Sequence, residues 1–208
     1  MPALTAPPAP ETAARTLEAL RSSQALLEGH FLLSSGRHAS RYVQCALLLQ
    51  HPARAAAVCQ DLAAQIRVAG ARWDVVVGPA MGAVTFAYEL ARALGVRGLF
   101  AERGADGVFM LRRGFGVGPR ERVLVAEDVV TTGKSVREVM DLMCAGGVRD
   151  IGAASIVNRS GRPDPFGETP YWRCLDLEVP AWEAAECALC RDGKSGPAVK
   201  PGSRPGLS

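Results

Sequence analysis

Short apolar runs alternate with amphipathic stretches through the middle of the chain. Residues 74–77, 122–126 and 150–157 are nearly continuous in apolar side chains, as strands covered on both faces of a parallel sheet are. Between them, residues 83–94 and 135–144 carry apolar positions at helical spacing and are followed by glycines. This alternation predicts an α/β fold with a parallel sheet flanked by helices.

The first quarter of the chain has a different pattern. Leu17, Leu20, Leu26 and Leu27 fit one face of a helix that ends near Gly29. Next, the apolar residues 31–33 and 42–43 flank a polar turn, which predicts a β-hairpin. Three further elements are expected: a helix over 52–70 between a proline and a glycine, a strand over 97–101, and a glycine-bounded hairpin over 107–115.

Composition narrows the class of protein. The 208 residues include 24 basic and 21 acidic ones, and a net charge of +3 argues against a nucleic-acid or anionic-membrane binder. Residues 1–10 and 192–208 are rich in Pro, Gly, Ala and Ser, and we expect both to be mobile tails. No stretch is long and apolar enough to span a membrane, the N-terminus does not look like a secretory signal, and six cysteines are too few for a disulfide scaffold. A reduced, cytoplasmic protein is expected.

The segment Val123–Ser135, VLVAEDVVTTGKS, carries the clearest chemistry. An apolar strand ends in Glu127 and Asp128, and hydroxyl and glycine residues follow at a helix N-terminus, where backbone N–H groups favour a phosphate. Because the two carboxylates would repel that phosphate, they must serve sugar hydroxyls, a divalent cation or a developing positive charge. A P-loop ATPase is excluded, since Asp128 stands where that motif requires glycine.

All thirteen positions of this segment fit the motif of type I phosphoribosyltransferases that binds 5-phosphoribosyl 1-diphosphate (PRPP). The resemblance implies that Glu127 and Asp128 hold the ribose hydroxyls and face an oxocarbenium-like transition state. It implies that the 5-phosphate is bound by the loop that follows, comprising Val129, Val130, Thr131, Thr132, Gly133, Lys134 and Ser135. Mg²⁺ is expected as a cofactor carried on the oxygens of PRPP, with no protein residue as a direct ligand.

Three other segments resemble the orotate phosphoribosyltransferases. Residues 29–38 with Tyr42 resemble that family's N-terminal hairpin, and residues 77–82 resemble its diphosphate loop, which implies contacts from Ala80, Met81 and Gly82. Arg159 follows Thr131 by 28 residues, the interval at which the family places the arginine that binds the orotate carboxylate. The implied orotate contacts are Thr131, Arg159, Ser34 and Tyr42.

The resemblance implies a type I phosphoribosyltransferase fold in a single domain over 11–190, with a small hood from residues 11–50 plus a C-terminal segment, and a flexible β-hairpin loop. Departures indicate a divergent branch. Residues 102–115 contain no Lys or His, unlike the family's mobile loop, and Gly82 and Ser34 stand where lysines are common. Arg103, Arg112 and Arg113 are the available cations for the leaving diphosphate; the alternative is a charged hairpin on a solvated face.

We therefore expect an enzyme that joins orotate to PRPP, with Glu127, Asp128, Arg112 and Arg113 in catalytic roles. A homodimer is expected, in which the 102–115 loop is a candidate for completing the neighbour's site. Two alternatives remain: a phosphoribosyltransferase for a purine or uracil, and a regulator that binds PRPP and nucleic acid.

Cys187 and Cys190 have the spacing of metal ligands, but a zinc site needs four ligands and the chain has no second such pair of cysteines. We interpret them as unpaired structural thiols, with a metal site shared across a dimer as the alternative.

Overall fold

The central sheet has six strands and confirms the predicted α/β class. The structure is a computed structural model that describes residues 7–33 and 35–200. The strand order is β5-β4-β3-β6-β7-β8. Five of the strands are parallel, and the short β5 pairs antiparallel to β4 at one edge. The strands are β3 (Val75–Pro79), β4 (Arg97–Arg103), β5 (Phe109–Met110), β6 (Arg122–Val130), β7 (Asp150–Asn158) and β8 (Tyr171–Asp176).

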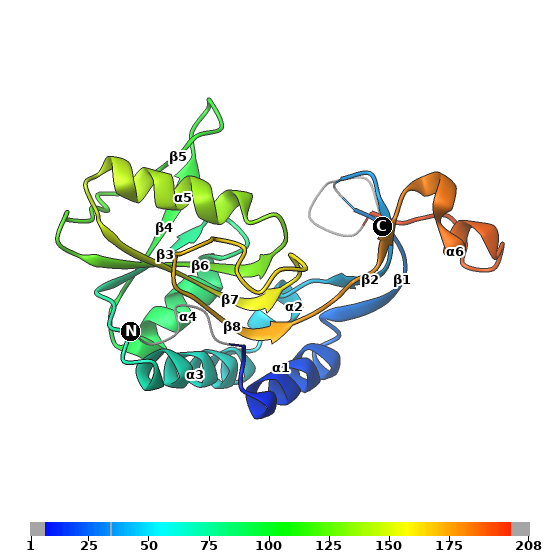
Figure 1. Cartoon of the computed structure of the whole chain (residues 1–208), viewed down its shortest axis with the longest axis horizontal. Coiled ribbons are helices and arrows are strands. Elements are labelled where there is room, and N and C mark those ends of the chain that lie inside the picture. The colour runs from blue at the N-terminus through cyan, green and yellow to red at the C-terminus, as the bar shows by residue number, and fades with distance from the viewer. Residues whose placement is uncertain (1–6, 34, 201–208) are drawn as a thin grey trace.

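Helices cover both faces of this sheet (Figure 1). The helices α1 (Pro10–Ser22), α3 (Pro52–Val68) and α4 (Val84–Leu94) lie on one face, and α5 (Lys134–Ala145) lies on the other. Because neighbouring residues of a strand point to opposite faces, the strands supply two cores. Val76 and Leu124 pack in the core under α3 and α4, whereas Val75, Val77 and Val123 pack in the core under α5.

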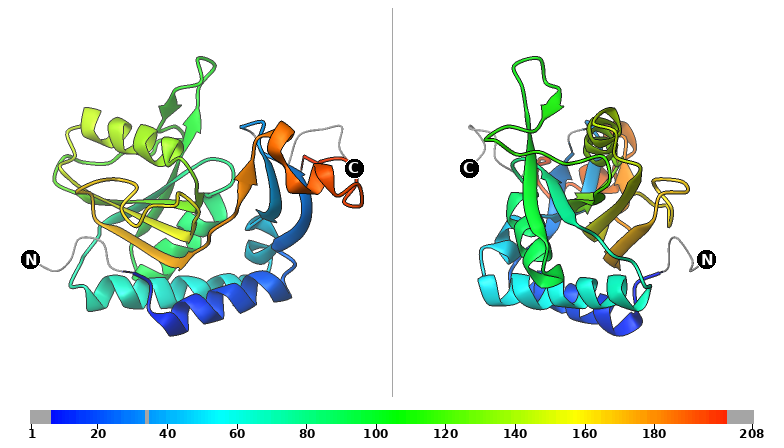
Figure 2. Two further views of the ribbon diagram at one scale, coloured as in Figure 1. Left: turned by 45° about the vertical axis from the view of Figure 1, so that its right-hand side comes forward. Right: turned by 90° about the vertical axis from the view of Figure 1, so that its left-hand side faces the viewer.

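A second, three-stranded sheet lies beside the main one. It consists of β1 (Leu26–Leu32), β2 (His38–Val43) and β9 (Ala181–Trp182), in the order β1-β2-β9. A short helix α2 (Ala46–Leu49) follows β2, and the 3₁₀ turn η1 (Ala184–Glu186) and helix α6 (Ala188–Arg191) follow β9. Figures 1 and 2 show the C-terminal segment crossing from β8 to pack against the β1–β2 hairpin.

Several elements differ from the sequence-based expectation. Leu26 and Leu27 belong to β1, because α1 ends at Ser22 and Gln24 turns the chain with a φ of 54°. The strand β6 continues to Val130, so that Glu127 and Asp128 lie within the strand and not after it. The hairpin expected over 107–115 is formed instead by β4 and the short β5, and the strands β8 and β9 and the C-terminal helix α6 were not predicted.

The segment expected to be a C-terminal tail is partly bound to the fold. Residues 192–200 are described, and Val199 exchanges backbone hydrogen bonds of 2.8 Å with His30 and Leu32 of β1. The prediction of a mobile segment from residue 192 therefore differs from the structure up to residue 200. No helix among the described residues is long and apolar enough to cross a bilayer.

Candidate active site

The carboxyl ends of β3, β6 and β7 meet at the edge of the sheet that faces the β1–β2 hairpin (Figure 1). Two distances locate Asp128 at this edge. The Cys45 thiol, just after β2, lies 4.0 Å from the Asp128 backbone oxygen. A Cβ placed on Gly82 would lie 3.8 Å from Asp128 Oδ1, which is ordinary van der Waals contact. The loop that contains Ala80, Met81 and Gly82 therefore adjoins the acidic pair, as ligand loops of open α/β sheets do.

The acidic pair lies in a setting that disfavours negative charge. Burial and the neighbouring Asp128 raise the pKa of Glu127 to about 7, although the Ser135 side chain donates a hydrogen bond that opposes the shift. Burial also raises the pKa of Asp128, against a 3.0 Å hydrogen bond that its Oδ1 accepts from the Val129 N–H. Two carboxylates held together with so little compensation favour a ligand that brings hydroxyl donors or positive charge.

Neighbouring side chains support the hydroxyl loop, residues 131–135, which follows the acidic pair. Gly133 adopts a φ of 72° at the start of α5, and a Cβ there would come within 2.7 Å of the Phe166 ring. Arg137 donates hydrogen bonds to the Thr132 carbonyl (2.6 Å) and the Pro165 carbonyl (2.9 Å). These contacts hold the loop in place while Thr131 and Thr132 stay exposed. Its backbone N–H groups are thereby available to an anion at the N-terminus of α5.

Lys134 and Ser135 point in different directions from this loop. Lys134 Nζ lies 3.8 Å from Glu138 with its side chain 77% exposed, so it faces solvent. Ser135 faces the site through its hydrogen bond to Glu127.

Arg159 lies just beyond β7, and its backbone N–H donates a 2.7 Å hydrogen bond to the Val130 carbonyl. Its Nε is buried without a hydrogen-bond partner among the described residues. Burial lowers the pKa of Arg159, and Tyr42 opposes that shift; Tyr42 in turn is close enough to Arg159 and Asp128 for both to influence its own pKa, which burial raises. The fold thus brings Tyr42, Asp128 and Arg159 together from β2, β6 and the end of β7. Ser34, the other predicted orotate contact, lies outside the described residues.

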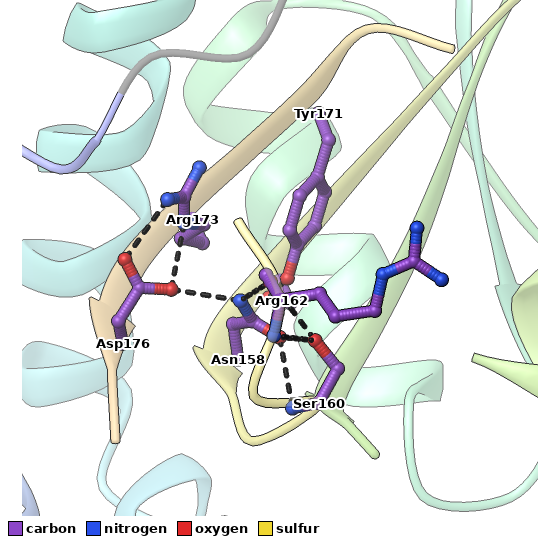
Figure 3. A network of polar contacts seen from close by, with 7 residues as sticks. Asn158, Ser160, Arg162, Tyr171, Arg173 and Asp176 are labelled. Carbon is purple, nitrogen blue, oxygen red and sulfur yellow. Dashed lines mark hydrogen bonds and ion pairs between the residues drawn. The ribbon is translucent and has the colours of Figure 1, made fainter. Parts of the chain in front are cut away.

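A polar network fixes the turn that carries Arg159 (Figure 3). The Asn158 amide donates to Asp176 Oδ1 (2.7 Å) and to the Arg162 carbonyl (2.8 Å), while its Oδ1 accepts from the Ser160 hydroxyl (2.7 Å). Asp176 also accepts two hydrogen bonds from the buried Arg173, at 2.8 and 2.9 Å. These hydrogen bonds hold β8 to the turn and so fix the backbone position from which the Arg159 side chain extends. The sequence motifs did not predict this network.

The hairpin arginines are engaged with neighbouring acids. Arg113 donates two 2.9 Å hydrogen bonds to Glu102, and Arg103 lies 2.6 Å from Glu138 with its guanidinium 4.0 Å over the Phe109 ring. Arg112 is exposed. The positive charge of Arg103 lowers the pKa of Glu127, so this arginine acts on the acidic pair. Whether the three arginines bind the diphosphate stays a prediction.

The acidic pair within the last part of β6, the hydroxyl loop at the N-terminus of α5 and the hood beside the strand ends together define a phosphoribosyltransferase. The family model described as phosphoribosyl transferase domain matches residues 46–188. The chain is 52% identical over 190 residues to the orotate phosphoribosyltransferase of Heliobacterium modesticaldum, covering 91% of this chain and 97% of that protein. The chain belongs to the orotate phosphoribosyltransferase family.

Solved structures agree with this assignment. The crystal structure of orotate phosphoribosyltransferase from Aeropyrum pernix has a TM-score of 0.61 at 26% identity, covering 78% of this chain and 94% of that one. The Mycobacterium tuberculosis H37Rv orotate phosphoribosyltransferase in complex with inorganic phosphate has a TM-score of 0.59 at 25% identity, covering 81% and 97%.

Proposed function

We propose that the protein transfers the 5-phosphoribosyl group of PRPP to orotate, releasing diphosphate and orotidine 5′-phosphate for pyrimidine biosynthesis. The environment of Arg159 is the observation that favours orotate as the base. Its guanidinium is partly buried, its Nε has no hydrogen-bond partner among the described residues, and it lies close to Tyr42, which is also close to Asp128. A planar cation in that position is suited to a carboxylate, the group that distinguishes orotate from uracil.

The roles of the residues follow from their positions. Backbone N–H groups of residues 131–135 and the hydroxyls of Thr131 and Thr132 would bind the 5-phosphate, and Glu127 with Asp128 would bind the ribose hydroxyls. A bond forms between a ring nitrogen of orotate and the anomeric carbon as the bond from that carbon to diphosphate breaks, and the nitrogen loses its proton. The anomeric carbon gains positive charge in the transition state. Fixed carboxylates nearby stabilise that charge, so positioning and electrostatics supply the rate.

Mg²⁺ is proposed as the cofactor. The acidic pair favours a dication nearby, because burial and the neighbouring Asp128 raise the pKa of Glu127 and so leave negative charge at the pair poorly compensated. We propose that the ion is held through the diphosphate and ribose oxygens of PRPP, where it neutralises the leaving group, and that Ala80–Gly82 lie beside that diphosphate.

A homodimer in the cytoplasm is proposed as the working form, with residues 102–115 of one subunit reaching the neighbour's site. The turn between β4 and β5 projects beyond α5 and is available for such a contact (Figures 1 and 2). Hybrid dimers of Glu127→Gln and Arg112→Ala chains test this: mixing two weakly active variants should restore activity at one site. Activity of the mixture equal to the mean of the two variants would contradict it.

The base is tested directly by incubating the protein with PRPP, Mg²⁺ and, in turn, orotate, uracil, adenine and hypoxanthine. Consumption of orotate with release of diphosphate is expected, with little loss of the other bases. Faster use of a purine or of uracil would replace the assignment with another phosphoribosyltransferase activity. PRPP binding without turnover of any base would favour the alternative of a regulator.

A further inference from the structure

Four metal-ligating side chains converge at the three-stranded sheet, apart from the residues assigned to catalysis. His30 lies on β1, His38 lies on β2, and Cys187 and Cys190 lie at the start and within α6. One ligand atom from each falls within a group whose members are all within 4.8 Å of one another. The chain has no second pair of cysteines at that spacing, and the second pair of ligands is instead a pair of histidines, eight residues apart in the hairpin.

Three nitrogen–sulfur distances within the cluster are close to the edges of a tetrahedral site. His30 Nε2 lies 3.4 Å from Cys187 Sγ and 3.6 Å from Cys190 Sγ, and His38 Nδ1 lies 3.3 Å from Cys190 Sγ. For zinc bonds of about 2.0 to 2.3 Å, tetrahedral N–S edges are about 3.6 Å and N–N edges about 3.3 Å. The two ring nitrogens are 2.9 Å apart, so only a small separation would complete the geometry.

The hydrogen bond that His30 makes through Nδ1 orients its other ring nitrogen, Nε2, toward the other three ligand atoms. His30 Nδ1 lies 2.8 Å from the Gly196 carbonyl, which can only accept a hydrogen bond. The ring proton therefore resides on Nδ1, and Nε2 directs its lone pair at the two sulfurs. A histidine ligand held through its other nitrogen by a backbone carbonyl is the usual arrangement around protein-bound zinc.

Among the described residues, polar contacts such as the Arg37–Glu183 ion pair join the C-terminal segment to the hairpin, with little apolar packing between them. Cys187, Ala39 and Phe31 are buried here, yet they belong to neither hydrophobic core. The strand β9 contributes two residues, and the segment beyond α6 is joined to β1 through Val199 and Gly196. A small unit without a core of its own commonly depends on a bound metal.

We propose that His30, His38, Cys187 and Cys190 bind one structural zinc ion per chain, which fastens the C-terminal segment to the β1–β2 hairpin. Two thiolates and two neutral imidazoles balance the charge of the dication. Four protein ligands leave no open position, so the site is structural and not catalytic. Thiolate ligands also separate it from the Mg²⁺ proposed for PRPP, which prefers oxygen.

The first test measures metal in the full-length chain, purified without a polyhistidine tag and without chelator. Elemental analysis should find about one zinc per chain in the wild type. Cys190→Ser and His38→Gln should each lose most of it. Two matched controls, Cys144→Ser and His51→Gln, change an exposed cysteine and an exposed histidine elsewhere and should retain the metal.

The second test needs no substitution. Replacing the metal with Co²⁺ should give the visible bands of a tetrahedral ion together with thiolate-to-metal charge transfer in the near ultraviolet, and stripping the metal should speed proteolytic cleavage within residues 183–200. Wild-type protein that neither contains zinc nor takes up Co²⁺, or that carries a Cys187–Cys190 disulfide in non-reducing mass spectrometry, overturns the proposal. Metal content does not depend on which base the enzyme uses. The metal analysis can therefore contradict the zinc site while the activity assay supports the proposed function, or the reverse.

Discussion

Replacing Arg159 should have two opposite effects: it should weaken the use of orotate and stabilise the protein without substrate. Arg159→Gln removes the charge proposed to bind the orotate carboxylate while keeping a polar side chain. Losing one partner of a desolvated, hydrogen-bonded charge pair costs about 2 to 5 kcal/mol, and about 3 kcal/mol corresponds to a loss of roughly 100-fold in kcat/KM for orotate. The KM for PRPP should change little, because Arg159 follows β7 and not the phosphate loop.

The same substitution should stabilise the protein without substrate. In the free protein the buried Nε has no partner among the described residues, and burial lowers the pKa of the group. Relief of a buried, unpaired donor is worth about 1 kcal/mol at the low end, which suits a side chain that is only partly buried. For a chain of this size that corresponds to a melting temperature about 2 to 4 °C higher.

Steady-state kinetics with each substrate varied, together with thermal unfolding without ligand, measure both effects. Arg162→Gln is the matched control, since its side chain points away from the network and its carbonyl, which accepts from Asn158, is unchanged (Figure 3). Equal increases in the two KM values would refute the carboxylate assignment. A lower melting temperature for Arg159→Gln would refute the view that the free site stores an uncompensated charge.

Three further predictions concern the phosphate loop, the acidic pair and the hairpin. Gly133→Ala should weaken PRPP binding and destabilise the fold more than Gly161→Ala, because both glycines have a φ of 72° but only at Gly133 would the new Cβ meet the Phe166 ring, at 2.7 Å; equal melting temperatures would discount that contact. The pKa of Glu127 is raised from 4.5 to about 7, so the folded state holds the proton more tightly and stability is lost as pH rises through that window. Glu127→Gln should therefore melt above the wild type at pH 8 and approach it near pH 4.5, whereas a gap that does not vary with pH would contradict this. Arg112→Ala should lower kcat and leave the melting temperature unchanged, and an unchanged kcat would assign Arg112 to the solvated face of the hairpin.

The central part of the molecule was predictable because its signals are local. Continuous apolar runs mark β3, β6 and β7 as buried strands, and the order of residues in 123–135 defines both the acidic pair and the loop after it. The end of α1 was predicted wrongly for a physical reason. Leu26 and Leu27 continue the helical spacing, and a short apolar run does not distinguish helix from strand.

The features that could not be predicted from the sequence depend on contacts between segments that are far apart in the chain. His30 and His38 come close to Cys187 and Cys190 only because β9 pairs with β2 and Val199 with Phe31. In the same way, Asn158 and Asp176 meet because β7 and β8 are neighbours in register. Spacing within a single segment contains neither pairing, so these contacts required the fold.

The placement of Glu127 and Asp128 inside β6, not in the loop after it, has a consequence for how the molecule fluctuates. Backbone pairing of β6 with β7 continues to Val130, which is fully buried, and Thr131 one residue later is exposed. Amide hydrogen exchange should therefore change from slow, global opening to fast, local opening across this single peptide link. The carboxylates proposed to face the developing charge thus lie in a strand with persistent backbone pairing, whereas the backbone N–H groups proposed to bind the phosphate start one residue beyond that pairing.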